Sequence, residues 1–186
     1  MIFTEAKLSG AYIIEPERLE DERGFFARVF CQEEFKAHGL HLDVVQCNIS
    51  FSKKKGTLRG MHYQVSPFQE AKLVRCTKGS IYDVIIDLRP NSPTFRQWLA
   101  TVLTAENERM VYVPVGFAHG FQSCEDESEI FYHMSEFYHP EAARGVRWDD
   151  PAFQISWPHV EQRVISARDR NCPDFDAKCL TEANWA

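Results

Sequence analysis

Short apolar segments separated by turn-forming residues constrain the fold of this chain more than any other feature. The segments are rich in Val, Ile, Phe and Tyr, and Gly, Pro, Asn and Ser residues lie between them. Such runs are typical of β-strands in an all-β domain. We predict strands at Ala11–Ile14, Phe25–Phe30, Asp43–Ser50, Leu58–Gln64, Lys72–Cys76, Ser80–Leu88, Trp98–Leu103, Met110–Val113, Phe121–Cys124 and Glu129–Met134.

Helical signals are few, and they do not change the predicted fold class. Gln32–His38 precedes Gly39 and favours a short helix, whereas Ser166–Arg170 favours a capped turn. A domain with so many strands must close them into a sandwich or a barrel, and a double-sheet jelly roll leaves few strand edges exposed. We therefore predict a jelly-roll barrel with short helices, whose mouth can hold a ligand.

Length, charge and cysteine usage exclude several classes of protein. The chain has 186 residues, which suits a single domain. Its net charge is -6 and its Lys and Arg residues are dispersed, so no basic surface for nucleic acid is expected. A secretory signal and an apolar run of membrane-spanning length are both missing. The six cysteines lack C-x-x-C and zinc-type spacing, so we expect reduced thiols in a cytoplasmic protein without membrane association.

Three side chains in the predicted strands could carry chemistry, although each also has an ordinary structural interpretation. His62 follows Gly60 in an apolar and aromatic strand, as either a core histidine or a base that removes a carbon-bound proton. Lys72 is either a solvated charge on a strand edge or a cation that stabilises an enolate. Tyr132 is either a core tyrosine or the acid that returns a proton to the opposite face, which inversion of a stereocentre requires.

Four motifs together resemble those of a known family. They are DERGFF at Asp21–Phe26, LRGMHYQ at Leu58–Gln64, SPTFRQW at Ser92–Trp98 and PVGFAHGF at Pro114–Phe121. From about 14 to 158, and again at 166–169, the chain is similar to the dTDP-4-dehydrorhamnose 3,5-epimerase family. The resemblance implies a homodimer of cupin-type double-stranded jelly-roll barrels. It also implies one epimerase domain over 1–186, with a core at about 10–158 and a C-terminal segment, 159–186, that contributes Asp169.

The resemblance assigns roles to individual positions. The proton-removing base of the family matches His62, and the aspartate that orients this base matches Asp169 in an SAKD-like segment. Lys72 matches the lysine that stabilises the enolate, and Tyr132 matches the proton donor. The substrate-binding positions implied by the resemblance are Arg23, Arg28, Gln46, Asn48, Arg59, His119 and Arg168. Arginine suits such positions because its planar guanidinium can donate two hydrogen bonds to phosphate oxygens.

The surroundings of the two histidines favour chemistry without a metal. His119 lies in P-x-G-x-x-H, a pattern shared by cupin barrels, many of which bind metal through this histidine. The other half of a cupin metal site, H-x-H followed by Glu, is missing because Tyr63 and Gln64 follow His62. The substrate that the resemblance implies contains a ketone, which already acidifies the neighbouring C–H groups, so we expect no organic cofactor either.

Departures from the family pattern concern the substrate more than the reaction. Relatives usually carry glutamate at the positions of Arg28 and Ala143, and their common Q-G-K is Glu70-Ala71-Lys72 in this chain. A guanidinium at position 28 would donate to the acceptors of cytosine, whereas glutamate would accept from thymine.

We predict a nucleotide-sugar substrate and epimerisation at C3, C5 or both of a 4-keto-6-deoxyhexose. The expected reaction converts dTDP-4-dehydro-6-deoxy-D-glucose to dTDP-4-dehydro-L-rhamnose in deoxysugar biosynthesis. One alternative is a single-position 3- or 5-epimerase or a ketoisomerase, including one that acts on a CDP-linked sugar. Alternatives from other classes are a metal-dependent cupin oxygenase and a non-catalytic sugar-binding barrel.

Overall fold

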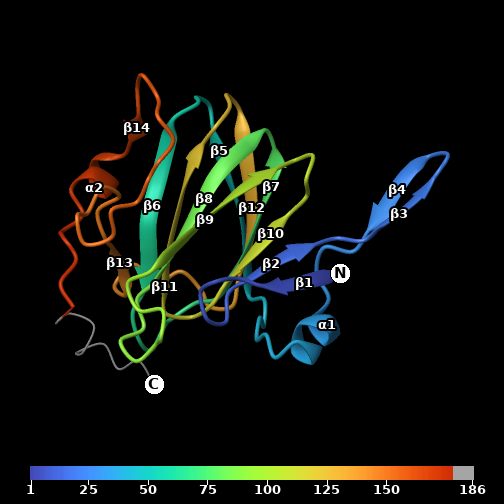
Figure 1. The fold of residues 1–186 in the computed structure, drawn as a ribbon, viewed down its shortest axis with the longest axis horizontal. Coiled ribbons are helices and arrows are strands. Elements are labelled where there is room, and N and C mark those ends of the chain that lie inside the picture. The colour runs from blue at the N-terminus through green and yellow to red at the C-terminus, as the bar shows by residue number, and fades with distance from the viewer. Residues whose placement is uncertain (178–186) are drawn as a thin grey trace.

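Two antiparallel sheets that face each other form the body of the molecule (Figure 1). The computed structural model describes residues 1–177, so Cys179 and the end of the predicted C-terminal segment lie outside the described residues. The first sheet contains, in spatial order, β1 (Ile2–Glu5), β2 (Tyr12–Glu15), β10 (Met110–Val113), β7 (Lys72–Lys78), β12 (Ser128–Met134) and β5 (Gln46–Ser52).

The second sheet contains the strands that carry both histidines of the motifs. In spatial order they are β13 (Ala143–Gly145), β6 (Thr57–Gln64), β11 (Phe117–Ser123), β8 (Ser80–Asp87) and β9 (Trp98–Thr104), and β14 (Val164–Ile165) pairs with β6 in parallel. Outside the two sheets lie a hairpin of β3 (Arg18–Asp21) and β4 (Gly24–Ala27), and the helices α1 (Gln32–Ala37) and α2 (Ala167–Arg170). The predicted all-β jelly roll with short helices is confirmed.

Every predicted strand overlaps a strand of the structure, but some boundaries differ. β11 begins at Phe117 rather than at Phe121. His119 and Gly120 interrupt the apolar pattern before Phe121 in the sequence, yet every residue of the strand is buried. β4 ends at Ala27, short of the predicted end at Phe30. The sequence does not predict β1, β3, β13 or β14, each of which has at most four residues.

Apolar side chains pack in three layers around the sheets. Ile130 of the first sheet meets Ile85 and Phe121 of the second in the space between them. Phe153 covers the outer face of the second sheet, and Phe35 of α1 covers part of the outer face of the first. Neither helix is long or apolar enough to cross a membrane, and no other helix occurs in residues 1–177. The layer between the sheets leaves part of the interior open as a cavity.

The β3–β4 hairpin projects away from the barrel (Figure 1). Leu19, Phe25 and Phe26 on this hairpin are exposed apolar side chains. Arg18 at its base packs its guanidinium over the ring of Phe25, at 4.4 Å from the ring centroid. The hairpin therefore presents an apolar surface that no other part of residues 1–177 covers.

Candidate active site

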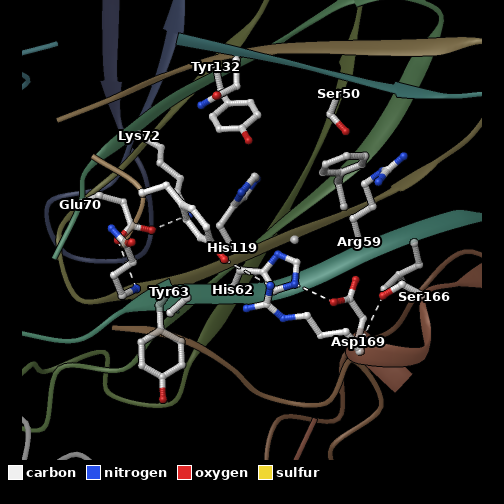
Figure 2. A pocket seen from close by; sticks show the side chains of 18 of the residues that line it. Ser50, Arg59, His62, Tyr63, Glu70, Lys72, His119, Tyr132, Ser166 and Asp169 are labelled. Carbon is white, nitrogen blue, oxygen red and sulfur yellow. Dashed lines mark hydrogen bonds and ion pairs between the residues drawn. The ribbon is translucent and has the colours of Figure 1, made fainter. Parts of the chain in front are cut away.

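A cavity of about 700 Å³ lies between the two sheets, and Figure 2 shows the side chains around it. Strands β5, β7 and β12 supply one wall, β6 and β11 supply the opposite wall, and residues of β14 and α2 complete the lining. This volume lies within the range of sites that bind small molecules.

His62 and Asp169 are in contact inside this cavity, although 107 residues separate them. The Nε2 atom of His62 lies 2.8 Å from Oδ1 of Asp169 (Figure 2). Parallel pairing of β14 with β6 brings the following helix α2 beside β6, and Ser166 caps this helix by accepting the N–H of Asp169. The short elements β14 and α2 thus place the carboxylate of Asp169 beside the imidazole of His62. This contact occupies Nε2 of the imidazole and leaves Nδ1 for a reacting group.

The carboxylate of Asp169 is held in its ionised form. Burial by itself would raise the pKa of Asp169, but hydrogen bonds from His62 and from the backbone N–H of Gly60 lower the pKa by more. The side chain of Asp169 is 6% exposed, whereas that of His62 is 41% exposed. A buried anion behind a partly accessible imidazole is the arrangement expected for a base and its orienting group.

Glycine at position 60 lets β6 and β11 approach each other closely. Gly60 has a φ of +127°, and a Cβ atom there would lie 2.5 Å from the Cα of Gly120. The register of the two strands shifts beside this point, and His62 and His119 are directly paired across it. Both imidazoles consequently line the cavity from the same wall.

Lys72 is buried, so its interpretation as a solvated strand-edge charge is wrong. Its side chain is 9% exposed, and its ammonium lies 2.8 Å from Oε1 of Glu70, whose side chain is 5% exposed. Both residues line the cavity. A cation that is fixed there can interact with negative charge that develops on a bound molecule.

Tyr132 lies on β12, across the cavity from His62 (Figure 2). Burial raises the pKa of Tyr132, and the charge of Glu70 adds to this rise while that of Arg59 opposes it. The phenol therefore keeps its proton at neutral pH. An imidazole and a protonated phenol on opposite sides of a cavity form a suitable pair for this chemistry. The imidazole can remove a proton from one face of a bound molecule, and the phenol can return a proton to the other face.

Five of the seven expected binding residues line the same cavity: Gln46, Asn48, Arg59, His119 and Arg168. Arg59 donates to the carbonyl oxygen of Phe51 at 3.0 Å, and Arg168 lies 3.3 Å from the hydroxyl of Tyr138. Both guanidinium groups retain N–H donors that these contacts do not use. The cavity can therefore offer two cationic forks to an anionic ligand.

Arg23 and Arg28 do not line the cavity of their own chain. The side chain of Arg23 is 84% exposed at the hairpin and pairs with Asp21. Arg28 donates to Glu34 of α1 at 2.9 Å. Arg23 of the DERGFF segment thus lies on the projecting hairpin, and Arg28 lies directly after the end of β4.

The cavity also contains residues for which the sequence analysis assigned no role. Glu70 and Arg144 line it, and Asp83 is buried behind His119, with Oδ2 at 2.7 Å from Nε2. Asp83 had a visible signal, because an acidic residue among the alternating apolar residues of a strand must find a partner when that face is buried. The only signal for Glu70 in the sequence was its position before a predicted strand.

The titratable groups of the cavity do not assemble into a metal site. Within residues 1–177, no group of three or more His, Cys, Asp or Glu side chains is arranged to hold a metal ion. His62 and His119 each direct Nε2 at a separate carboxylate rather than at a common point.

The sequence of this chain is similar to those of known proteins from one family. The profile of the dTDP-4-dehydrorhamnose 3,5-epimerase family matches residues 5–177. A protein of Methanothermobacter thermautotrophicus with the name dTDP-4-dehydrorhamnose 3,5-epimerase is 46% identical over 171 residues, which cover 91% of this chain and 91% of that protein.

Solved structures agree with this similarity. The dTDP-4-dehydrorhamnose 3,5-epimerase of Bacillus anthracis, with TDP and pyrophosphate bound, is 38% identical with a TM-score of 0.90, over 94% of this chain and 99% of that chain. The dTDP-6-deoxy-D-glucose-3,5-epimerase of Legionella pneumophila, in complex with dTDP-4-keto-L-rhamnose, is 37% identical with a TM-score of 0.89, over 95% of each chain.

Proposed function

This chain belongs to the dTDP-4-dehydrorhamnose 3,5-epimerase family, and on that premise we propose that it inverts C3 and C5 of dTDP-4-dehydro-6-deoxy-D-glucose. The product would be dTDP-4-dehydro-L-rhamnose. The observation that carries this proposal is the contact between His62 and Asp169, opposite Tyr132, in a cavity that also contains the buried ammonium of Lys72. Relatives with bound TDP or with a bound dTDP-linked sugar support the choice of substrate.

The reaction follows from the placement of these groups. His62 takes the proton from the carbon beside the C4 ketone, and the electrons of the broken C–H bond move onto the ketone oxygen. The ammonium of Lys72 stabilises the enolate, for which a single well-placed donor contributes about 3 kcal/mol. Tyr132 then gives its proton to the opposite face of the same carbon, the C4 ketone re-forms, and solvent restores both proton carriers. The same cycle at the second carbon completes the double inversion.

The diphosphate would bind where Arg59 and Arg168 offer guanidinium donors. A diphosphate carries oxygens that accept two parallel N–H bonds from each fork, so two arginines can hold it without a metal. Arg23 and Arg28 cannot contribute to this site within one chain, because neither lines its cavity. Their participation requires the hairpin of a second copy.

We propose a homodimer in which the β3–β4 hairpin of each copy reaches the cavity of the other. The exposed Phe25 and Phe26 on the hairpin support this arrangement, because apolar surface of this kind is typical of interfaces. On the outer face of the first sheet, Ile49 is exposed, and the buried atoms Nε of Arg75 and Nδ1 of His133 have no hydrogen-bond partner among residues 1–177.

A cytoplasmic location is also proposed, and the five cysteines of the described range, all free thiols, support it.

Proton exchange with solvent tests the proposed reaction. We expect that incubation with dTDP-4-dehydro-6-deoxy-D-glucose in heavy water introduces deuterium at both C3 and C5, because each enolate is reprotonated from groups that equilibrate with solvent. NMR of the recovered sugar measures this. Deuterium at one carbon only would identify a single-position epimerase, and no deuterium at either carbon would identify a non-catalytic binding barrel.

The same assay, after dialysis against EDTA, tests whether a metal takes part. We expect the exchange rate to stay within about twofold of the untreated enzyme, since Lys72 rather than a metal would stabilise the enolate. Loss of exchange with EDTA, and its return with a divalent cation, would show that the metal-independent proposal is wrong.

Complementation between two inactive variants tests the exchanged hairpin. We expect that His62→Ala and Arg23→Ala are each poorly active, but that their co-expression restores about a quarter of wild-type activity, because half of the dimers are mixed and one of the two sites in each is intact. Two different affinity tags isolate the mixed dimers. Co-expression of His62→Ala with Asp169→Asn is the matched control, since both changes lie in the same site, and it should restore nothing. Equal recovery in both mixtures would contradict the exchange.

A further inference from the structure

Glu70 links the two walls of the cavity at the level of the proposed catalytic groups. One carboxylate oxygen lies 2.8 Å from the ammonium of Lys72, at the start of β7 in the first sheet. The other oxygen accepts the backbone N–H of Gln64 at 3.1 Å, at the end of β6 in the second sheet. His62 lies two positions before Gln64 on the same strand. The carboxylate therefore connects the strand of the base directly to the ammonium.

The far end of this link is itself fixed. Gln64 is buried, and its side-chain amide donates to the carbonyl oxygens of Phe68 at 2.9 Å and Phe137 at 3.0 Å. Its carbonyl oxygen accepts the N–H of His139 at 2.6 Å. These contacts hold the end of β6 against two loops. The backbone donor that Glu70 contacts thus has little freedom to move.

Stability alone does not account for a buried ion pair at this place. Burial of two charges carries a desolvation penalty, and an apolar pair of similar size is often as stable or more stable. A free lysine side chain has four rotatable bonds and many rotamers, so an ammonium without a partner would be poorly aimed. The carboxylate restricts the ammonium of Lys72 to one part of the cavity, while its remaining N–H donors stay available.

We propose that Glu70 is a positioning residue that sets the place of the Lys72 ammonium relative to His62. The inference rests on the proposed function, in which His62 acts on the carbon beside the C4 ketone and Lys72 acts on the ketone oxygen. Glu70 itself would not react. Its contribution would appear in the chemical step, because misplacement of a catalytic group by about 1 Å can lower a rate on the order of 100-fold.

Substitutions at Glu70 give a graded test of this proposal. We expect Glu70→Leu to lower kcat about 100-fold with KM within about threefold of wild type. Glu70→Gln keeps the shape but has a single acceptor oxygen for two donors, so we expect an intermediate loss of about tenfold. Steady-state kinetics on the dTDP-linked keto sugar measures both. Unchanged kcat in Glu70→Leu, or a rise in KM alone, would overturn the positioning role.

A double-mutant cycle separates positioning from a general structural effect. If Glu70 acts through Lys72, then Glu70→Leu should cause no further loss of kcat in a Lys72→Met background. This double variant replaces the ion pair by an apolar pair, so it should remain folded. A second loss of similar size in the Lys72→Met background would show that Glu70 acts through other groups.

Asp87 provides a matched control for removal of a buried carboxylate. It is fully buried on β8, pairs with Arg89 and does not line the cavity. Asp87→Asn should lower the Tm and leave kcat unchanged. A wild-type enzyme that showed no proton exchange would refute the proposed function itself, whereas normal exchange with unaffected Glu70 variants would refute only the positioning role.

Discussion

Replacement of His62 by alanine should abolish proton exchange at both C3 and C5 of the substrate. We expect kcat to fall by about 10³-fold or more, because the variant lacks the proposed base for carbon-bound protons while the cavity retains its other groups. Deuterium incorporation in heavy water, followed by NMR over hours, measures the residual rate. Binding of dTDP should change little, since the guanidinium groups of Arg59 and Arg168 remain.

The orienting carboxylate should behave as part of the same unit. Asp169→Asn keeps the side-chain volume but removes the charge, and its amide can donate to Nε2 of His62, which would leave the wrong ring nitrogen protonated. We expect a loss of about 10⁴-fold in kcat, as is typical when the anion of a His–Asp pair is replaced by an amide. The double variant should be no worse than His62→Ala alone. Exchange at a near-normal rate in His62→Ala would contradict the assignment of the base.

Much of the fold could be predicted because the spacing of apolar residues along a strand reflects which of its faces is buried. Strands such as β8 and β12 alternate or run apolar over seven or eight residues, which is long enough for the pattern to show. β14 has only two residues and no pattern, yet its pairing with β6 delivers α2 to the active site. Short pairings of this kind depend on the tertiary structure, which a local sequence window does not contain.

The site could be predicted only in part from the residues themselves. Lys72 and Tyr132 lie in strands where the residues alone favoured an ordinary interpretation, and their place in the lining of a shared cavity supports the proposed catalytic roles. Asp169 is separated from His62 by 107 residues, so spacing could not pair them, and the pairing came from the family resemblance. The position of Arg23 on the projecting hairpin, outside the cavity, was not expected, because a local sequence window does not show where a hairpin projects.

Tyr132→Phe should separate proton removal from inversion. The phenylalanine keeps the aromatic ring within β12 and lacks only the hydroxyl, so His62 can still take a proton and return it to the same face. We expect deuterium exchange within about tenfold of the wild-type rate, together with a fall in net inversion of about 10²-fold or more, which is the usual contribution of a general acid. NMR of the recovered sugar distinguishes the two results, because exchange without inversion yields deuterated substrate of unchanged configuration.

A matched tyrosine establishes that the effect belongs to the cavity. Tyr112 is also buried, and its hydroxyl donates to the carbonyl oxygen of His41 outside the cavity. Tyr112→Phe should therefore lower stability by about 1 kcal/mol and leave inversion intact. Full inversion in Tyr132→Phe would move the donor role to another phenol, and Tyr138 is then the next candidate because it lines the same cavity. Loss of exchange together with inversion would instead mean that Tyr132 is needed before the proton is removed, and that the two faces of the reaction are not served by separate groups.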